Sequence, residues 1–238
     1  MSHFDIADVI RDFPDFRVGL VVAEGLTVPP TRTDELEAVV AAAERHAAER
    51  FGEIALDKVA ALKCWRDTYR AFGVKKTSYR SSVERLAKAV QRGRGLARVN
   101  GMVDLYNAVS LEALMPVGAD DLERVKLPFG FRRAERDESF IALGGETPDP
   151  PKPGEVVYAD AEKCLCRRWN WYQDARSAIG LGTERAVLTV QALEPNRADV
   201  CAVSERLATL LADHCGAHCA VAVADQATPR IELPLRMW

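Results

Sequence analysis

The residue pattern changes from helix-like to strand-like near residue 115, and this change constrains the fold more than any other feature of the sequence. Before this point, long stretches carry apolar residues at the spacing of amphipathic helices. Beyond it, short β-branched and aromatic runs alternate with Gly and Pro. Pro116 and Gly118 stand at the change. Helices and strands that are segregated along a chain are typical of an α+β fold.

The first half of the chain predicts one strand and four helices. The strand covers residues 17–22 and is closed off by a Pro-Pro turn. Thr33 precedes two acidic residues, as at a capped helix start, and Ser81 and Glu84 have the spacing of a capping box. The helices are expected over residues 33–50, 56–72, 81–93 and 100–114.

The second half predicts mainly strands. Residues 130–143 have the pattern of a hairpin that turns near Arg136 and Asp137, and the proline-rich segment 147–154 is expected to be a stiff loop. One more helix, stopped at Gly216, is expected near the C-terminal end. The remaining strands are expected over residues 155–160, 163–170, 186–193 and 219–224, and this helix over 197–214.

Size and composition place the chain among ordinary globular proteins. Its 238 residues are enough to bury a substantial core, and 48% hydrophobic with 28% charged residues is near the average, so composition indicates no function. No run of about 18 apolar residues occurs, and the N-terminal residues lack the pattern of a signal peptide. We therefore expect a cytoplasmic protein with no membrane association, whose six cysteines are free thiols.

Charge is distributed unevenly, although the net charge is only −3. Residues 1–60 carry twelve acidic and six basic residues, whereas residues 75–98 carry eight basic residues and one acidic residue. In the third helix, Arg85, Lys88 and Arg92 follow one face. A solvated face would mix in acids, so contact with phosphate groups of an anionic partner is an equally good interpretation. Lys75, Lys76 and Arg80 extend this basic patch.

The fourth helix gathers polar side chains along one stripe. Asn100, Asp104 and Asn107 lie at i, i+4 and i+7, with Val103 and Tyr106 beside them. Asn is a middling helix former that gains little on a solvated face, so something other than helicity is expected to select these side chains. The three polar residues are the candidate catalytic groups.

Residues 167–172, with the sequence RRWNWY, interleave basic and aromatic side chains. Guanidinium planes and aromatic rings stack well on an unpaired base, so Arg167, Arg168 and Trp169 are candidate binding residues. Burial of the two tryptophans in the core is a nearly equal alternative.

Two further features are candidates for contact with a substrate. Glu155 and Asp160 are carboxylates at the ends of an expected strand, where a cap or a salt bridge is the plainer alternative. Gly144 and Gly145 can offer backbone N–H groups to an oxyanion without interference from side chains. An ordinary turn explains the two glycines equally well.

The sequence excludes several kinds of active site. It contains no G-x-S-x-G, no G-x-x-x-x-G-K-[ST] and no H-E-x-x-H motif, and Gly93 and Gly95 lack the third glycine of a dinucleotide site. The His-Cys pairs at 214–215 and 218–219 offer a weak zinc pattern, because a helix end is expected between them; buried thiols are the better interpretation. No metal and no cofactor are expected.

Four motifs, taken in order, resemble the B3/B4 domain of the phenylalanyl-tRNA synthetase β subunit, and in particular free-standing B3/B4 proteins. They are VNGMVDLYNAVSL, LMPVGADDLERV, PKPGEVVYAD and CRRWNWYQ, and the similarity spans roughly residues 80–193. The resemblance implies a β-sandwich of unusual topology with packed helices. Residues 1–75 then form an added N-terminal strand and helical segment, and residues 76–238 form the B3/B4-like domain.

In the synthetase this domain hydrolyses tRNA charged with the wrong amino acid, so the resemblance implies a trans-acting aminoacyl-tRNA deacylase. An activated ester needs an oriented water and oxyanion donors more than a strong nucleophile. Asn100 and Asn107 would hold the water or the ester carbonyl, and Asp104 or Glu155 the α-ammonium group. The amino-acid moiety would enter a pocket, and the basic helix with residues 167–169 would meet the acceptor end of the tRNA.

Two alternatives stay open at the level of the sequence. The same fold can serve as a non-catalytic module that binds an amino acid or tRNA, because no residue is an unambiguous catalyst. Hydrolysis of a small amino-acid ester or amide is the other alternative, and it predicts no salt-dependent RNA binding.

Overall fold

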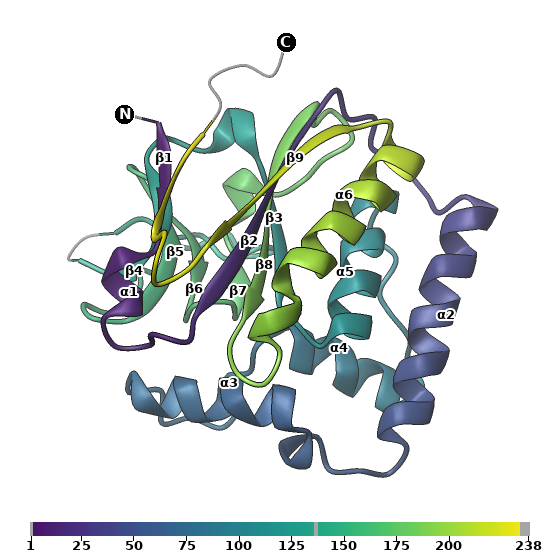
Figure 1. Ribbon diagram of the computed structural model, residues 1–238, viewed down its shortest axis with the longest axis horizontal. Helices are drawn as coiled ribbons and strands as arrows, with labels where there is room; N and C mark the ends of the chain where they lie inside the picture. Colours follow the sequence, from purple (N-terminus) through teal and green to yellow (C-terminus); the bar gives the residue numbers. More distant parts are fainter. Residues whose placement is uncertain (1, 136–137, 234–238) are drawn as a thin grey trace.

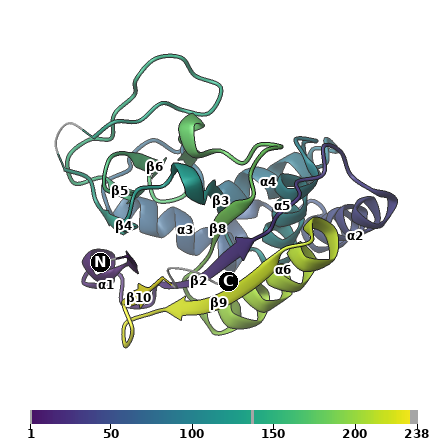
Figure 2. The same ribbon diagram turned by 90° about the horizontal axis from the view of Figure 1, so that it is seen from above.

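The computed structural model describes residues 2–135 and 138–233, and it has two β-sheets with helices packed against them (Figure 1). A four-stranded central sheet has helices on one side and a six-stranded sheet on the other. Seen from above, β4, β5 and β6 lie at the left and α2, α4 and α5 at the right (Figure 2). The α+β class expected from the sequence is confirmed.

The central sheet has the strand order β3-β8-β2-β9, and all neighbouring strands are antiparallel. Its two middle strands, β2 and β8, are β-branched runs that are buried along nearly their whole length. The strands are β2 (Arg17–Glu24), β3 (Val117–Asp121), β8 (Arg185–Ala192) and β9 (His218–Ala224). Three of the four were predicted within two residues at each end.

The second sheet has the order β10-β1-β4-β5-β6-β7. Its pairs are antiparallel except β1 with β4, which are parallel. The sheet therefore joins the first and last described strands of the chain. The strands are β1 (His3–Asp5), β4 (Phe129–Arg133), β5 (Val156–Ala159), β6 (Cys164–Arg167), β7 (Tyr172–Gln173) and β10 (Arg230–Glu232).

The hairpin expected over residues 130–143 is wrong, because β4 pairs with β5 instead. Phe131 lies opposite Tyr158 in this pair. All four residues of β5 are buried, so this strand suits an interior position in the sheet, whereas residues 139–142 form only isolated bridges. The turn expected near 136–137 lies outside the described residues.

The helices form two layers on the central sheet. Helices α5 and α6 contact its strands, and α2 and α4 pack on α5. Figure 1 shows α3 running across the lower edge of the molecule. The helices are α1 (Ala7–Ile10), α2 (Asp34–Phe51), α3 (Ala60–Ala71), α4 (Ser82–Gln91), α5 (Gly101–Ala113) and α6 (Val200–Cys215).

One of the two predicted helix caps is confirmed. Thr33 Oγ1 accepts a hydrogen bond from the backbone N–H of Leu36 at 3.3 Å, which caps α2. The capping box at Ser81 is wrong: this residue precedes α4, but its hydroxyl makes no capping hydrogen bond. Glu84 is drawn away from the helix start because its buried carboxylate pairs with the guanidinium groups of Arg66 and Arg80.

Two glycines let helices approach their neighbours closely. A Cβ on Gly19 in β2 would lie 1.8 Å from Ser204 Oγ in α6, so only glycine permits this strand–helix contact. A Cβ on Gly101 would lie 2.8 Å from Pro29, whose carbonyl accepts the N–H of this residue at the same distance. The Pro-Pro turn therefore fixes the start of α5.

The N-terminal residues contribute to both sheets. β1 lies between β10 and β4, and β2 lies between β8 and β9. Side chains of both strands belong to the main core cluster together with α5 and α6. The domain boundary at residue 75 stays a prediction. No helix in the described part of the chain is long and apolar enough to cross a membrane.

Candidate functional site

A cavity of about 550 Å³ opens between α4, α5 and the neighbouring strands. Its lining is divided by chemistry. Apolar side chains come mostly from the two helices and the segment that joins them, and polar side chains come mostly from the two sheets. The apolar group includes Leu86, Ala89, Leu96, Val99, Val103 and Leu143, and the polar group includes Asp120, Tyr158, Asn170, Gln173, Thr189 and Gln191.

Asp120 in β3 gives this cavity a buried carboxyl group. Its Oδ1 accepts hydrogen bonds from Ser177 Oγ at 2.6 Å and from Gln173 Nε2 at 3.1 Å. Oδ2 accepts none from the described residues. Burial raises the pKa of Asp120 to about 7, and the two hydrogen bonds oppose this rise. A carboxyl group that titrates near neutral pH is suited to proton transfer.

A chain of hydrogen bonds fixes three further polar side chains of the cavity, those of Asn170, Gln191 and Thr189. Tyr69 donates its hydroxyl proton to Asn170 Oδ1 at 2.8 Å, and Asn170 Nδ2 donates to Gln191 Oε1 at 3.0 Å. Gln191 Nε2 in turn donates to Thr189 Oγ1 at 3.1 Å. Since each amide is held by a neighbour, the floor of the cavity is ordered before any ligand enters.

The predicted polar stripe of α5 is divided between structural roles and the cavity. Asn100 is the N-cap of α5, where its Oδ1 accepts the N–H of Val103 at 2.9 Å. Asp104 is buried and pairs with Arg32, with 2.7 Å between Oδ2 and Nε. Of the three predicted catalytic residues, Asn107 alone lines the cavity.

The rim segment, residues 94–99, depends on the Arg32–Asp104 pair. Asp104 Oδ1 accepts the N–H of Val99 at 2.9 Å, and Arg32 Nη2 donates to the carbonyl oxygens of Leu96 and the following residue, both at 3.3 Å. Several residues of this segment line the cavity. Asp104 therefore has a positioning role, because it holds the segment that forms one wall of the cavity.

The residues of the predicted basic patch lie in different environments. Arg85 lines the cavity, donates to the carbonyl oxygen of Trp171 at 2.7 Å, and lies 4.8 Å from the ring centre of Tyr172. Arg80 turns away from solvent toward Glu84, at 3.1 Å. Lys88 is partly exposed, and Lys75, Lys76 and Arg92 are exposed.

Trp169 belongs to the core. Its side chain is fully buried and packs edge-on against Phe13, Phe16 and Trp65, with ring centres 4.7 to 5.6 Å apart. The ring therefore has no free face on which a base could stack, and the alternative of core burial describes this tryptophan. Trp171, two residues later, is partly exposed and lines the cavity.

Arg167 and Glu155 are also engaged with each other. Two hydrogen bonds of 2.9 and 3.0 Å join the guanidinium group to the carboxylate, and Asp149 Oδ2 lies 2.6 Å from Arg167 Nη1. These contacts tie the proline-rich loop to β6. Neither Arg167 nor Glu155 lines the cavity, so the structure does not bring them together with Asn107.

The remaining predicted groups do not line this cavity. Gly144 and Gly145 follow Leu143, which lines the cavity, in an exposed loop. The N–H of Gly145 already donates to the carbonyl oxygen of Ala142 at 2.7 Å. Asp160 is buried and pairs with Lys163 at 2.7 Å.

The cysteines carry no metal site. All six are free, as expected. No group of three or more His, Cys, Asp or Glu side chains among residues 2–135 and 138–233 is arranged to hold a metal ion. Burial raises the pKa of Cys166, the one cysteine that lines the cavity.

The part of the chain that contains this cavity matches a known protein family. The model of the B3/4 domain family matches residues 64–216, which is more than half of the chain. The chain belongs to the B3/4 domain family. Every residue that lines the cavity lies between Ser82 and Gln191, inside the matched region.

Two relatives are phenylalanyl-tRNA synthetase β subunits. The phenylalanine–tRNA ligase β subunit of Fusobacterium nucleatum is 35% identical over 74 residues, which cover 31% of this chain and 9% of that protein. The crystal structure of an N-terminal fragment of the β subunit from Pyrococcus horikoshii covers 89% of this chain and 48% of that one, with 13% identity and a TM-score of 0.44. This chain thus spans less than half the length of either relative.

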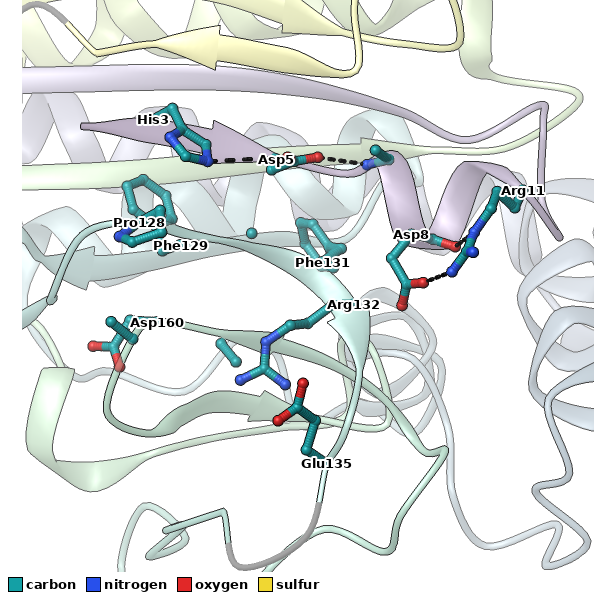
Figure 3. A pocket seen from close by; sticks show the side chains of 14 residues that line it. His3, Asp5, Asp8, Arg11, Pro128, Phe129, Phe131, Arg132, Glu135 and Asp160 are labelled. Atoms are coloured by element: carbon teal, nitrogen blue, oxygen red, sulfur yellow. Dashed lines mark hydrogen bonds and ion pairs between the residues drawn. The ribbon is translucent and has the colours of Figure 1, made fainter. Parts of the chain in front are cut away.

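A second cavity, of about 630 Å³, is lined by residues of β1, α1, β4 and the end of β5 (Figure 3). Its charged groups are engaged with one another: His3 lies beside Asp5 and Arg11 pairs with Asp8. Arg132 pairs with Glu138. The walls formed by β1 and α1 lie outside the region matched by the B3/4 family. We therefore place the candidate site in the first cavity.

Sequence reasoning missed most of the polar floor of the site. Asp120, Gln173 and Gln191 stand on three different strands, so their spacing in the sequence carries no local signal. A partial signal did exist, because Asp120 and Gln173 fall within two of the motifs that resemble B3/B4 proteins. For α5, the cavity faces the stripe that contains Val103 and Tyr106, beside the stripe that was predicted.

Proposed function

We propose that this B3/4 family protein hydrolyses aminoacyl-tRNA in trans and that the reaction takes place in the cavity between α4 and α5. The observation that carries this proposal is the cavity itself. It combines a buried carboxyl group that titrates near neutral pH, an ordered floor of amides, an apolar wall and two arginines, Arg85 and Arg94. A protein to which part of this chain is similar carries the name phenylalanine–tRNA ligase β subunit.

The size and lining of the cavity suit the charged end of a tRNA. Pockets of 300 to 1,000 Å³ are typical for small ligands, and about 550 Å³ leaves room for an amino acid together with part of the nucleoside that carries it. The apolar wall suits a hydrophobic amino-acid side chain. The arginines carry the charge that a phosphate backbone requires.

The proposed reaction needs one water molecule and no covalent intermediate. Asp120 Oδ2 accepts a proton from water while the water oxygen bonds to the ester carbonyl carbon. The resulting oxyanion accepts a hydrogen bond from the side-chain amide of Asn107. When the tetrahedral carbon collapses, the bond to the ribose oxygen breaks, and Asp120 returns the proton to that oxygen. The products are a free amino acid and tRNA with its hydroxyl group restored.

The other predicted residues have roles in this proposal that differ from those first expected. Asn100 and Asp104 position α5 and the rim. Arg167 and Glu155 hold the proline-rich loop, which follows Gly144 and Gly145 in the chain. Arg85 and Lys88 on α4, Arg92 directly after it, and Lys75 and Lys76 before it form the basic side that the tRNA approaches. Arg80 is held toward Glu84 beside them.

Deacylation of a panel of correctly charged and mischarged tRNAs by the purified protein tests the proposal. We expect selective hydrolysis of one mischarged species, and Asp120→Asn to lower the rate by about 10²-fold or more, since this variant keeps the hydrogen-bond acceptor but loses the base. Glu123→Gln, an exposed carboxylate just beyond β3, is the control. If every ester in the panel stays intact, the protein is not a deacylase.

A non-catalytic binding module is the second candidate, and one observation favours it. Two of the three predicted catalytic side chains, Asn100 and Asp104, are used in holding the fold. A binding module predicts that uncharged tRNA or a free amino acid binds with no turnover. Tight binding by Asp120→Asn together with lost hydrolysis would exclude this candidate.

A further inference from the structure

We infer that a row of stacked aromatic and guanidinium groups beside the cavity is a binding platform for the unpaired 3′-terminal nucleotides of RNA. The inference rests on the proposed function, because it names the surface by which that substrate would be held. The platform consists of Tyr79 from the segment before α4, Arg85 from α4, Arg168 and Trp171 from the turn between β6 and β7, and Tyr172 from β7.

The five side chains form a continuous series of contacts. The Arg168 guanidinium carbon lies 3.8 Å from the ring centre of Tyr79 and 4.4 Å from that of Trp171. The Trp171 and Tyr172 rings are 5.1 Å apart, and Arg85 lies 4.8 Å from the Tyr172 ring on the far side. The Tyr79 and Trp171 rings also meet edge-on, with their centres 4.8 Å apart, so the three rings and two cations hold one another in place.

Arg168 is built into this row at a cost. Its φ is +48° and that of Trp169 is +68°, a left-handed conformation that side chains other than glycine rarely adopt. Two interactions hold the turn in this shape. The Trp169 side chain is fully buried in the core, and the Arg168 N–H donates a hydrogen bond to Glu155 Oε1 at 3.1 Å.

The charge of Arg168 has no acidic partner. The residue is 8% exposed, its Nη1 is buried without a hydrogen-bond acceptor, and it makes no ion pair with any described residue. A buried guanidinium group is normally paired with a carboxylate, so this arrangement lowers stability unless something else uses the charge. The phosphates of a bound strand would use this charge. The guanidinium plane itself is covered by Tyr79 and Trp171, so bases would stack on the partly exposed rings beside it.

Exposure and position make the platform available to a ligand. Tyr79, Trp171 and Tyr172 are each partly exposed, unlike Trp169 in the same turn. Trp171, Tyr172 and Arg85 also line the cavity, so the platform leads directly into the candidate site. At the other end, the exposed Lys75 and Lys76 precede Tyr79 by a few residues.

Single-stranded RNA fits these features better than a duplex. Aromatic rings bind unpaired bases by stacking, whichever base is presented, and nearby cations hold the backbone. In a duplex the base faces are already stacked on one another. With the terminal nucleoside at the cavity, the preceding unpaired nucleotides would lie along Trp171 and Tyr79 toward the two lysines.

Binding of uncharged RNA hairpins tests the platform without any need for catalysis. One labelled hairpin carries an unpaired 3′ CCA and the other ends flush. We expect the protein to bind the overhanging hairpin at least 5-fold more tightly, and we expect Tyr79→Leu and Trp171→Leu to remove most of that preference. Tyr79→Phe and Trp171→Phe, which keep an aromatic plane, serve as matched controls and should retain it.

Arg168→Lys separates the guanidinium plane from its charge. We expect this variant to lose at least 3-fold of the preference for the overhang, because an ammonium group does not stack as a plane. Urea unfolding of every variant shows whether the fold persists. The Leu variants should unfold cooperatively near the midpoints of their Phe partners.

Three results would overturn the inference. They are equal binding of the two hairpins, absence of binding to either, and full retention of the preference in a folded Leu variant. Because the hairpins carry no amino acid, hydrolysis of charged tRNA without preference for the overhang would remove the platform and keep the deacylase. Preference for the overhang without hydrolysis would do the reverse.

Discussion

At the scale of single residues, Asp120 links the stability of the fold to pH. Its pKa is raised in the folded protein to about 7 from an ordinary 3.8, so the folded state holds a proton that the unfolded state has lost at intermediate pH. This contribution to stability is complete below pH 4 and disappears as pH rises through 7. We expect Asp120→Asn to gain stability over the parent protein between pH 5 and 8, by roughly 2–4 kcal/mol, in urea unfolding. Parallel pH profiles for the two proteins would contradict this assignment.

The same group sets the expected pH dependence of hydrolysis. A general base acts only when its carboxylate is ionised, so the rate constant for deacylation should rise with pH and level off above about 7. Single-turnover rates with one mischarged tRNA between pH 5.5 and 8.5 measure this profile. The residual activity of Asp120→Asn should keep rising with pH and show no plateau above 7, because attack by hydroxide grows in proportion to the hydroxide concentration. A rate that is flat from pH 5.5 would exclude Asp120 as the base.

The sequence pattern correctly singled out Asp104 as a special residue, but its role is structural and not the catalytic one that was predicted. We expect Asp104→Asn to lower the free energy of unfolding by about 3 kcal/mol, because it leaves the buried guanidinium of Arg32 with only the longer ion pair to Glu37, at 3.4 Å. Asn100→Ala, which removes the N-cap of the same helix, should cost about 1 kcal/mol. Chemical denaturation compares the two. A cost below 1 kcal/mol for Asp104→Asn would show that the pair does not hold the rim.

At the scale of elements, local chemistry in the sequence was enough to find most helices and strands. Thr33 caps α2 because its hydroxyl and the first turn are contiguous in the chain. The pairing of β4 with β5 could not be found in the same way. The two strands are 22 residues apart in the sequence, and the choice of partner depends on which strand is buried on both faces. The role of Glu84 could not be predicted locally either, because its carboxylate pairs with Arg66 of α3 and does not cap α4.

Helix α4 is the element on which the tRNA hypothesis can be tested most directly. We expect the triple change of Arg85, Lys88 and Arg92 to Glu to weaken tRNA binding by at least 10-fold at low salt, because three attractive contacts with phosphates become repulsive. Binding titrations at two salt concentrations should show a shallower salt slope. The control is Arg206→Glu on α6, an exposed arginine outside the cavity and the platform. Unaltered affinity in the triple variant would leave α4 as an ordinary solvated helix.

At the scale of the whole molecule, the family resemblance gave the class of fold, while assembly of the site depended on long-range pairing. Asp120, Gln173 and Gln191 meet because β3 and β8 pair in the central sheet and β7 ends the other sheet nearby. Asn107 was found from its helix alone, since one helix carries both the pattern and the residue. The N-terminal strands were harder to place, because β2 has the sequence of any buried strand and nothing local shows which neighbours it joins.

The position of β2 leads to a prediction about the boundary expected at residue 75. β2 lies between β8 and β9, so a fragment of residues 76–238 would lose the middle of the central sheet and leave both neighbours with unpaired edges. We expect this fragment to lack a cooperative unfolding transition in circular dichroism. Adding residues 1–75 as a separate chain should restore the transition, since the missing strand can pair from both sides. A fragment that folds cooperatively alone would show that residues 76–238 form an independent domain, to which the first 75 residues are only an addition.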